Sequence, residues 1–332
     1  MAVLCFFVAV GCTPFFNRSK GSKKNNDSLN QQQQESPMPI DPYEQAKEVS
    51  IILYFKHEIA DFLVPEKRTV LQEKQSIEQL VVEELLKGPQ NFERRLVMPS
   101  NTKVLDVTRK LDTVYVNLSE DFLNPIDLSD IPGREDTPEA DIPKVQAEMK
   151  RLAVYSIVNS LTYLDGVNQV KLMVNNSQPT YHDMGTELLI EEGSDLKPDS
   201  PMIAIRRNKN VNLSPARTVR MVLNALSAEP DWDIIYMFLS NKTMDGSTLP
   251  PLDEFKEMIP PVVGGMITFE GNPVLDEEYV IGDKSKAFVI VRYTDKTADT
   301  DTPKEVTEVL TVDDAEGIWK VRLPAFFSRF KQ

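Results

Sequence analysis

The chain has 332 residues, of which 41% are hydrophobic and 27% charged. These proportions are those of a folded protein, and the length suits two domains and a tail. The formal net charge of −14 argues against a nucleic-acid binder, which needs a basic face to replace counterions on phosphates. With two cysteines and two histidines, the chain has few groups for zinc or histidine chemistry. We therefore expect no cofactor, no metal site and no enzyme activity.

Residues 1–11 form an apolar run that is too short to span a membrane but suits the core of a secretion signal. The run ends in Ala9-Val10-Gly11-Cys12, which resembles the lipobox of bacterial lipoproteins. The resemblance implies cleavage before Cys12, a lipid on its sulfur and a protein anchored at the extracytoplasmic face of the cell membrane. An ordinary cleaved signal peptide and an uncleaved anchor are the alternatives. Because no Lys or Arg precedes the run, we expect the true start codon to lie upstream.

Residues 17–48 are predicted to be a flexible linker that follows the signal peptide and lipobox at 1–16. This stretch is rich in Lys, Gln and Pro and has little apolar surface to bury. Its lysines suit either a weak contact with anionic headgroups or a solvated linker. The folded part is therefore expected to begin near residue 49.

The stretch Ser76–Pro89 carries the signals of one short helix. Ser76 is predicted to cap the first turn, with Gln79 reaching back as in a capping box. Gly88 supplies the left-handed residue that ends the helix. Apolar residues between these signals recur at three- and four-residue spacing, namely Ile77, Leu80, Val81 and Leu85.

The strand and helix patterns on either side of this helix predict a first domain at residues 49–199. Its last part, residues 179–199, is expected to act as a connector to the next domain. The patterns predict the order β-α-β-β-α-β, an α+β fold in which two helices cover one face of a sheet. The remaining predicted elements are a strand at 50–55, a loop through 62–65, strands at 103–107 and 113–118, a helix at about 145–164 and a strand at 167–175.

Several segments of this domain resemble the GerM domain of sporulation and spore-germination lipoproteins. They occur in the family's order from Ser50 to about Asn176 and read LYF, LVPEKRTV, SIEQLVVEELLKGP, MPSNTKVLDV, VYVNLSEDF and SLTYLDGVNQVKLMVN. The resemblance implies a non-enzymatic domain that acts in envelope-associated assemblies. It also implies contacts through exposed sheet edges and helix faces.

A second domain is predicted at residues 200–332, with helices first and a meander of strands afterwards. Helices are expected from Ser214 and at 234–239 and 252–258, and strands at 266–269, 278–281, 287–293, 306–312 and 318–321. This order, with the final Ile-Trp-Lys-Val strand, resembles the NTF2-like cone of helices and a curved sheet. By resemblance, such a cone holds a small ligand, supports dimerisation or does neither.

Four groups of side chains are candidates for a site. Trp232, Tyr236 and Trp319 are candidates for a ligand pocket in the cone, and core packing is the alternative. The six carboxylates between Asp127 and Asp141 suit either calcium or a solvated loop, and they lack the spacing of a calcium-binding hand. His182 with Asp183 suits acid–base chemistry or a hydrogen-bonded surface histidine. The basic residues Arg206, Arg207 and Lys209 are expected to form a charged surface.

Taken together, these patterns favour a membrane-anchored extracytoplasmic lipoprotein that makes protein–protein contacts. The expected partners are envelope proteins or further copies of the chain, in a cell-envelope or sporulation-associated assembly. A module that captures a small ligand or peptidoglycan fragment in the C-terminal cone is the alternative. A cell-wall hydrolase is a third hypothesis, and it would need carboxylates clustered in a cleft.

Overall fold

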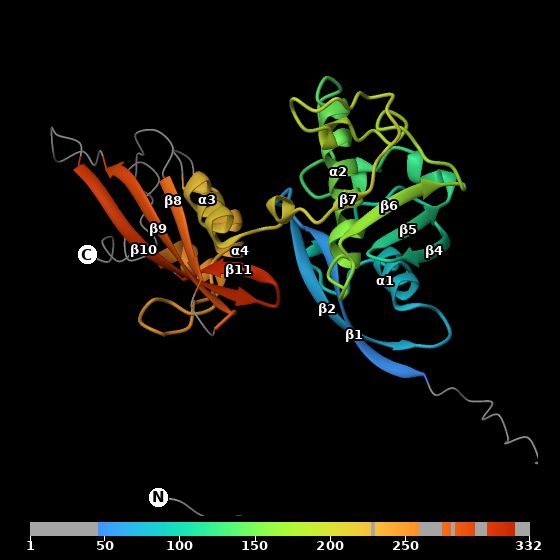
Figure 1. The fold of residues 1–332 in the computed structure, drawn as a ribbon. Coiled ribbons are helices and arrows are strands. Elements are labelled where there is room, and N and C mark those ends of the chain that lie inside the picture. Colours follow the sequence, from blue (N-terminus) through green and yellow to red (C-terminus); the bar gives the residue numbers. More distant parts are fainter. Residues whose placement is uncertain (1–45, 227–229, 259–273, 280–282, 296–303, 323–332) are drawn as a thin grey trace, which may run out of the picture. The chain divides into compact units, whose positions relative to one another are not determined.

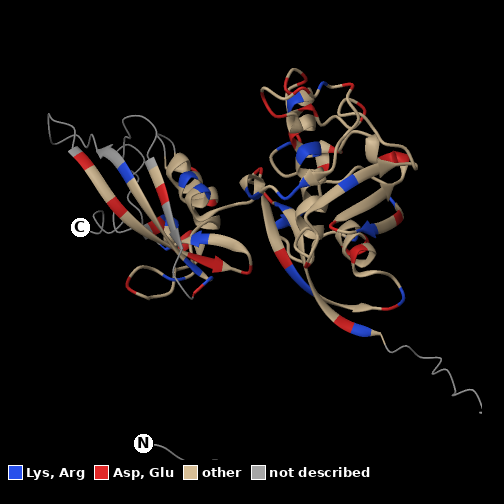
Figure 2. Cartoon of the chain, viewed as in Figure 1, with Lys and Arg blue, Asp and Glu red and all other residues tan. Residues whose placement is uncertain are grey.

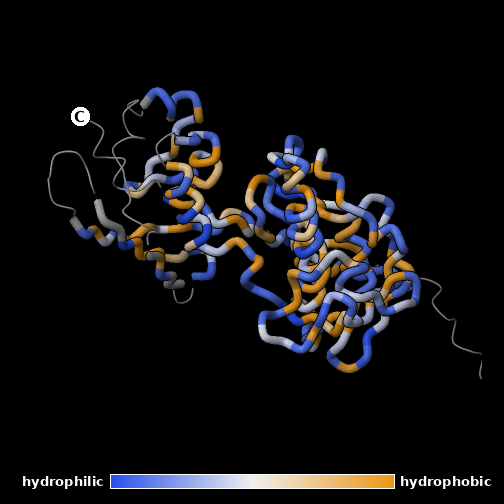
Figure 3. Tube along the Cα trace, turned by 90° about the horizontal axis from the view of Figure 1, so that it is seen from above, coloured by the Kyte–Doolittle hydropathy of each residue, from blue (hydrophilic) through white to orange (hydrophobic). Residues whose placement is uncertain are grey.

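The computed structural model describes residues 46–226, 230–258, 274–279, 283–295 and 304–322 (Figure 1). These residues belong to one compact unit, which comprises residues 45–332. Their hydrophobic side chains form two core clusters, one drawn from residues 51–211 and the other mainly from Leu213 onwards. Hydrophobic residues gather in the packed helices and strands, whereas the connecting loops are mostly hydrophilic (Figure 3). We call the described residues up to Leu213 the N-terminal part and those from Ser214 the C-terminal part.

The N-terminal part contains two sheets, with strand orders β2-β1-β3 and β4-β5-β6-β7. Strands β5 and β6 are parallel, and all other neighbours are antiparallel. The strands are β1 (Lys47–His57), β2 (Leu63–Gln72), β3 (Arg94–Arg95), β4 (Val104–Lys110), β5 (Thr113–Leu118), β6 (Gln169–Val174) and β7 (Ile205–Arg206). The prediction of a single sheet was therefore wrong.

Strand β2 lies where the sequence predicted a loop through residues 62–65. It pairs with β1 along almost its whole length. The inward-facing positions of β2 include Glu66 and Arg68, so no alternation of apolar and polar residues marks it as a strand. Both side chains are buried, and they are tolerated there because the Arg68 guanidinium lies 2.5 Å from the Glu66 carboxylate and 3.0 Å from that of Glu84.

Helix α1 (Ile77–Leu86) begins and ends as predicted. The Ser76 hydroxyl accepts a hydrogen bond from the Gln79 backbone N–H at 3.1 Å, and Gly88 has a φ of +84°. The second half of the expected capping box is absent, because the Gln79 side chain donates instead to Glu83 at 2.7 Å. The start of α1 therefore depends on the Ser76 hydroxyl.

Helix α2 (Ile142–Leu161) is the central helix of the N-terminal part. It packs against β1 of one sheet and against β6 and β7 of the other. Because strands from both sheets contact it, most of its residues from Met149 onwards are buried. The helix starts and ends three residues earlier than the sequence predicted. Short 3₁₀ helices lie in the loops around it: η1 (Glu120–Leu123), η2 (Leu128–Asp130), η3 (Glu187–Leu189) and η4 (Lys209–Val211).

The C-terminal part has the predicted order of helices followed by strands. Its elements are α3 (Pro215–Ala225), α4 (Trp232–Met237), α5 (Leu252–Met258), β8 (Val274–Tyr279), β9 (Lys286–Asp295), β10 (Lys304–Ala315) and β11 (Ile318–Val321). The strands form an antiparallel sheet in the order β11-β10-β9-β8, and α3 contacts β8, β9 and β11. The strand expected at 266–269 lies outside the described residues. The resemblance to an NTF2-like cone, and the domain boundary at residue 200, stay predictions.

Candidate functional site

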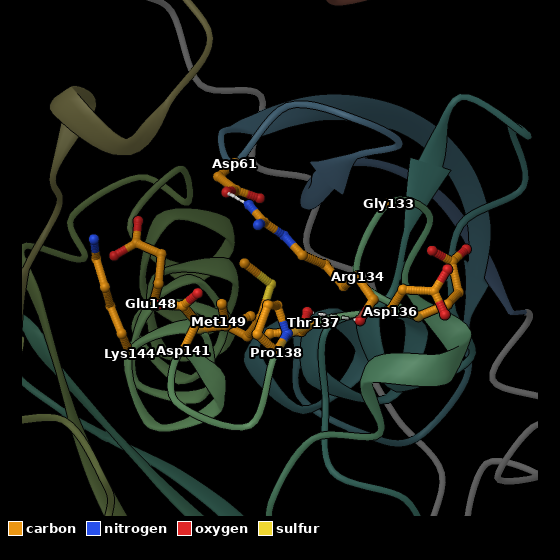
Figure 4. Close-up of a pocket in the computed structure, with 12 residues that line it drawn as sticks. Asp61, Gly133, Arg134, Asp136, Thr137, Pro138, Asp141, Lys144, Glu148 and Met149 are labelled. Carbon is orange, nitrogen blue, oxygen red and sulfur yellow. Dashed lines mark hydrogen bonds and ion pairs between the residues drawn. The ribbon is translucent and has the colours of Figure 1, made fainter.

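A groove opens in the N-terminal part, at the start of α2 (Figure 4). Its volume is about 590 Å³. One wall is the loop of residues 133–141, another is the first turns of α2 from Lys144 to Met149, and Asp61 lies opposite the loop. Val145 is half-buried and gives the groove an apolar surface next to the fully buried Met149, whereas Glu135 and Asp136 are exposed at the rim. The groove thus combines an apolar floor with a charged rim.

An ion pair crosses this groove. The Arg134 side chain reaches from the loop to the Asp61 carboxylate, to which it donates a hydrogen bond (Figure 4). Behind this pair, the Lys56 ammonium lies 3.4 Å from Asp61 Oδ1 and donates to the carbonyl oxygens of His57 at 3.0 Å and Glu58 at 3.2 Å. Burial lowers the pKa of Lys56, and the Asp61 charge opposes that shift. Asp61 is therefore fixed between two cations, one buried and one at the surface.

The segment that leads into the rim, residues 126–131, is anchored to the protein core. Ile126 and Ile131 are buried in the first core cluster. Gln146 of α2 accepts a hydrogen bond from the Ile126 N–H at 2.9 Å and donates to the Ile126 carbonyl oxygen at 2.6 Å. The carboxylates of this segment are exposed to solvent, as predicted. The chain that carries them is not a fully solvated loop, because Ile126 and Ile131 are buried.

Lys150 holds the chain just before this loop. Its ammonium donates to the carbonyl oxygens of Phe122 at 2.6 Å and Asn124 at 2.7 Å. The side chain is buried and lies over the Phe122 ring. Because burial disfavours the charged form, the pKa of Lys150 falls from 10.5 to about 8. Lys150 therefore links α2 to the segment that leads into the rim.

Several charged residues in and near the groove are already paired within the protein. Glu148 is paired with Arg151 one turn further along α2, and Arg134 with Asp61. Asp127, at the start of the loop, accepts hydrogen bonds from the Ser129 N–H and hydroxyl, which lower the pKa of its carboxyl. Within the described ranges, no group of three or more Asp, Glu, His or Cys side chains is placed to hold a metal ion.

The residues predicted to line a pocket in the C-terminal part pack around a phenylalanine. Trp232 and Tyr236 both contact the Phe255 ring, with ring centroids 6.3 Å and 5.5 Å away. The Tyr236 hydroxyl donates to the Pro250 carbonyl oxygen at 2.8 Å. Trp319 is partly buried against the second core cluster, to which Phe255 also belongs. These contacts suit core packing, and the ligand pocket stays a prediction.

The remaining candidates are the His182–Asp183 pair and the basic residues at 206–209, and all but Arg207 are exposed at the surface. His182 is exposed, and its Nδ1 lies 3.0 Å from a Glu187 carboxylate oxygen, as the surface alternative predicted. The exception is Arg207, which was expected on a charged surface but stacks on the rings of Tyr54 and Tyr163. Cys12 lies outside the described residues. In the described part of the chain, no helix combines the length and apolar character needed to cross a bilayer.

Residues 52–180 match the family model described as "Germane: Sporulation and spore germination". The matched segment begins in β1, ends after β6 and contains every residue that lines the groove. The predicted GerM-domain resemblance is thereby confirmed for these residues. No curated protein matches the sequence.

Three solved structures are similar to parts of the chain. The tandem GerMN domains of the sporulation protein GerM from Bacillus subtilis are 16% identical, with a TM-score of 0.32, over 53% of this chain and 51% of that one. A putative lipoprotein from Clostridium perfringens is 17% identical, with a TM-score of 0.25, and the match covers 47% of this chain and 87% of that one. The first GerMN domain of the Bacillus protein is 22% identical, with a TM-score of 0.25, and the match covers 39% of this chain and 84% of that one. The chain thus spans about half the length of the first of these structures.

Proposed function

We propose that this protein is a non-enzymatic lipoprotein, anchored through Cys12 at the extracytoplasmic face of the membrane. Its Germane segment makes protein–protein contacts in a cell-envelope or sporulation-associated assembly. The groove at the start of α2 is the contact site. The observation that carries this proposal is the anchored segment 126–131, because it leads directly into the rim where charged side chains are exposed.

An anchored loop favours binding for an entropic reason. A partner that binds a mobile loop must also order it, whereas the start of the rim is already held through Ile126, Ile131 and Gln146. Binding residues are commonly carried on loops that a rigid scaffold positions. The rim carries Glu135, Asp136 and Glu139, so it complements a partner with a basic surface. Arg134, which is paired with Asp61, and the exposed Lys144 also line the groove. Acidic and basic side chains are interspersed over the rest of the described residues as well (Figure 2).

Reversing charge at the rim is expected to reduce partner capture. In the variant Glu135→Lys with Asp136→Lys, the partner's basic groups would face lysines, so recovery of the partner from detergent-solubilised membranes should fall about tenfold or more. The matched control is Glu191→Lys with Glu192→Lys, two exposed acids in the connector. Equal recovery with both double variants would contradict a contact at the groove.

The anchor is tested separately. Cys12→Ala removes the only sulfur in the lipobox-like segment to which a lipid could be attached. We expect this variant to move from the membrane pellet to the soluble fraction, because a lipid chain contributes about 0.8 kcal/mol of binding per buried methylene. Fractionation should be compared with that of Cys5→Ala, which leaves the lipobox unchanged. An unchanged membrane fraction for Cys12→Ala would refute the lipid anchor.

A further inference from the structure

A second groove has aromatic residues in its wall. Residues of the N-terminal part form most of its lining, and Asp314, Glu316 and Gly317 of the C-terminal part complete it. Phe92 is 78% exposed and Tyr163 is 52% exposed, and both line this groove together with the half-buried Ile52 and the buried Tyr54 of β1. We call these four residues the aromatic surface. Single exposed apolar residues are common, but several around one groove are characteristic of a binding site. None of the four lines the groove at the start of α2.

Phe92 is held in its exposed position by hydrogen bonds. The buried Glu66 carboxylate accepts from the backbone N–H of Gln90 at 3.1 Å and of Asn91 at 3.3 Å. The Asn91 side-chain oxygen accepts from the Glu93 N–H at 2.8 Å. The loop on either side of Phe92 is therefore fixed, and the exposure of its ring is a property of the fold.

The two tyrosines are held by a shared cation. The Arg207 guanidinium lies 5.4 Å from the centroid of the Tyr54 ring and 5.1 Å from that of Tyr163. Arg207 also donates a hydrogen bond to the Tyr54 hydroxyl. Cation–π contacts of this kind stabilise the positions of both rings. The positions of these two rings are therefore fixed by the protein itself, without a ligand.

We propose that the aromatic surface binds a neutral oligosaccharide. The apolar C–H faces of pyranose rings pack against aromatic side chains, and their hydroxyls need hydrogen-bonding groups beside those rings. Gln90, Asn91 and Lys67 line the same groove and supply such groups. Gln90 and Lys67 are exposed, and the register of the hairpin places Lys67 directly opposite Ile52.

An extended peptide fits this surface less well. Peptides often bind by adding a strand to an open sheet edge. At Ile52 and Tyr54, one side of β1 is paired with β2, and on the other side the Tyr54 N–H donates to the Ser160 hydroxyl at 2.9 Å. An added strand could therefore not pair with the Tyr54 N–H. The exposed rings and their polar neighbours favour ring stacking instead.

The proposal is tested by calorimetric titration of the purified full-length protein with cellohexaose, maltohexaose and chitohexaose. At least one should bind, and Phe92→Ala and Tyr163→Ala should each weaken binding roughly three- to tenfold. Phe288→Ala, an aromatic deletion on β9 in the C-terminal part, should leave binding unchanged. The rim variant Glu135→Lys with Asp136→Lys should also bind normally, which separates this test from that of the proposed function.

Two results would overturn the proposal. The first is no binding of any of the three oligosaccharides at millimolar concentrations, the weak end of specific recognition. The second is an affinity in Phe92→Ala equal to that of the parent protein. Because Phe92 is largely exposed, its replacement should not alter thermal unfolding, and a melting curve confirms that the variant is folded.

Discussion

Replacing Arg68 with alanine is expected to lower the free energy of unfolding by about 3–5 kcal/mol. The Arg68 side chain is almost fully buried, and it contacts the carboxylates of Glu66 and Glu84. It also donates to the carbonyl oxygens of Glu84 at 3.1 Å and Gly88 at 2.9 Å. Without the guanidinium, Glu84 would keep only Lys87 and Glu66 only the more distant Arg94 as counter-ions, and the link between β2 and the end of α1 would be broken.

The matched control for this substitution is Lys67→Ala. Lys67 neighbours Arg68 in β2 but is exposed, so its replacement should change the free energy of unfolding by no more than about 0.5 kcal/mol. Denaturant unfolding of the three proteins measures both effects. If Arg68→Ala were no more destabilising than Lys67→Ala, the ion cluster would not be a stabilising feature of the fold.

Lys150 is expected to make the stability of the protein rise with pH. Its pKa is about 8 in the folded protein and 10.5 in an ordinary environment. Between these values the unfolded chain holds a proton that the folded chain has released, so the free energy of unfolding increases as pH rises. The difference of about 2.5 pH units corresponds to at most about 3 kcal/mol. Below pH 8 the cost of burying the charge is present in full.

Other lysines and tyrosines also titrate in this range, so the measurement is a comparison between variants. Denaturant unfolding from pH 7 to 10.5 should show a smaller rise in Lys150→Met than in the parent protein. Lys144→Met, at an exposed lysine on the same helix, should keep the parent's pH dependence. Identical curves for Lys150→Met and the parent would show that the Lys150 charge is not penalised by burial.

Local signals predicted several elements of the fold correctly. The Ser76 cap and the left-handed Gly88 depend only on neighbouring residues, and both occur at α1. The same is true of the Ser214 cap, which accepts from the Arg217 N–H at the start of α3. Helix α5 and strand β11 have the predicted bounds. These signals act over a few residues, so the sequence alone contains them.

The features missed by the sequence analysis depend on distant partners. Strand β2 could not be recognised because the charges of Glu66 and Arg68 face inwards, and the carboxylate that completes their pairing comes from Glu84 on α1. Arg207 resembled a surface charge because its ring partner Tyr54 lies about 150 residues away in the sequence.

The candidate groove was missed for a similar reason. Ile126, Leu128 and Ile131 are the few apolar residues of an acidic, proline-containing segment, which predicts solvation. Their burial depends on contacts with the first core cluster, and Gln146 contributes two further hydrogen bonds. These three apolar residues within the acidic run were the one signal that could have indicated an anchored segment.

The proposed role as a contact protein is tested most directly by photo-cross-linking in intact cells. A photoreactive amino acid is placed at position 136 on the rim in one strain and at position 191 in the connector in another. We expect Asp136 to give a discrete cross-linked product, with another envelope protein or a second copy of the chain, and Glu191 to give little or none. Only uncross-linked monomer from position 136, in cells where the protein is expressed and folded, would contradict the proposal.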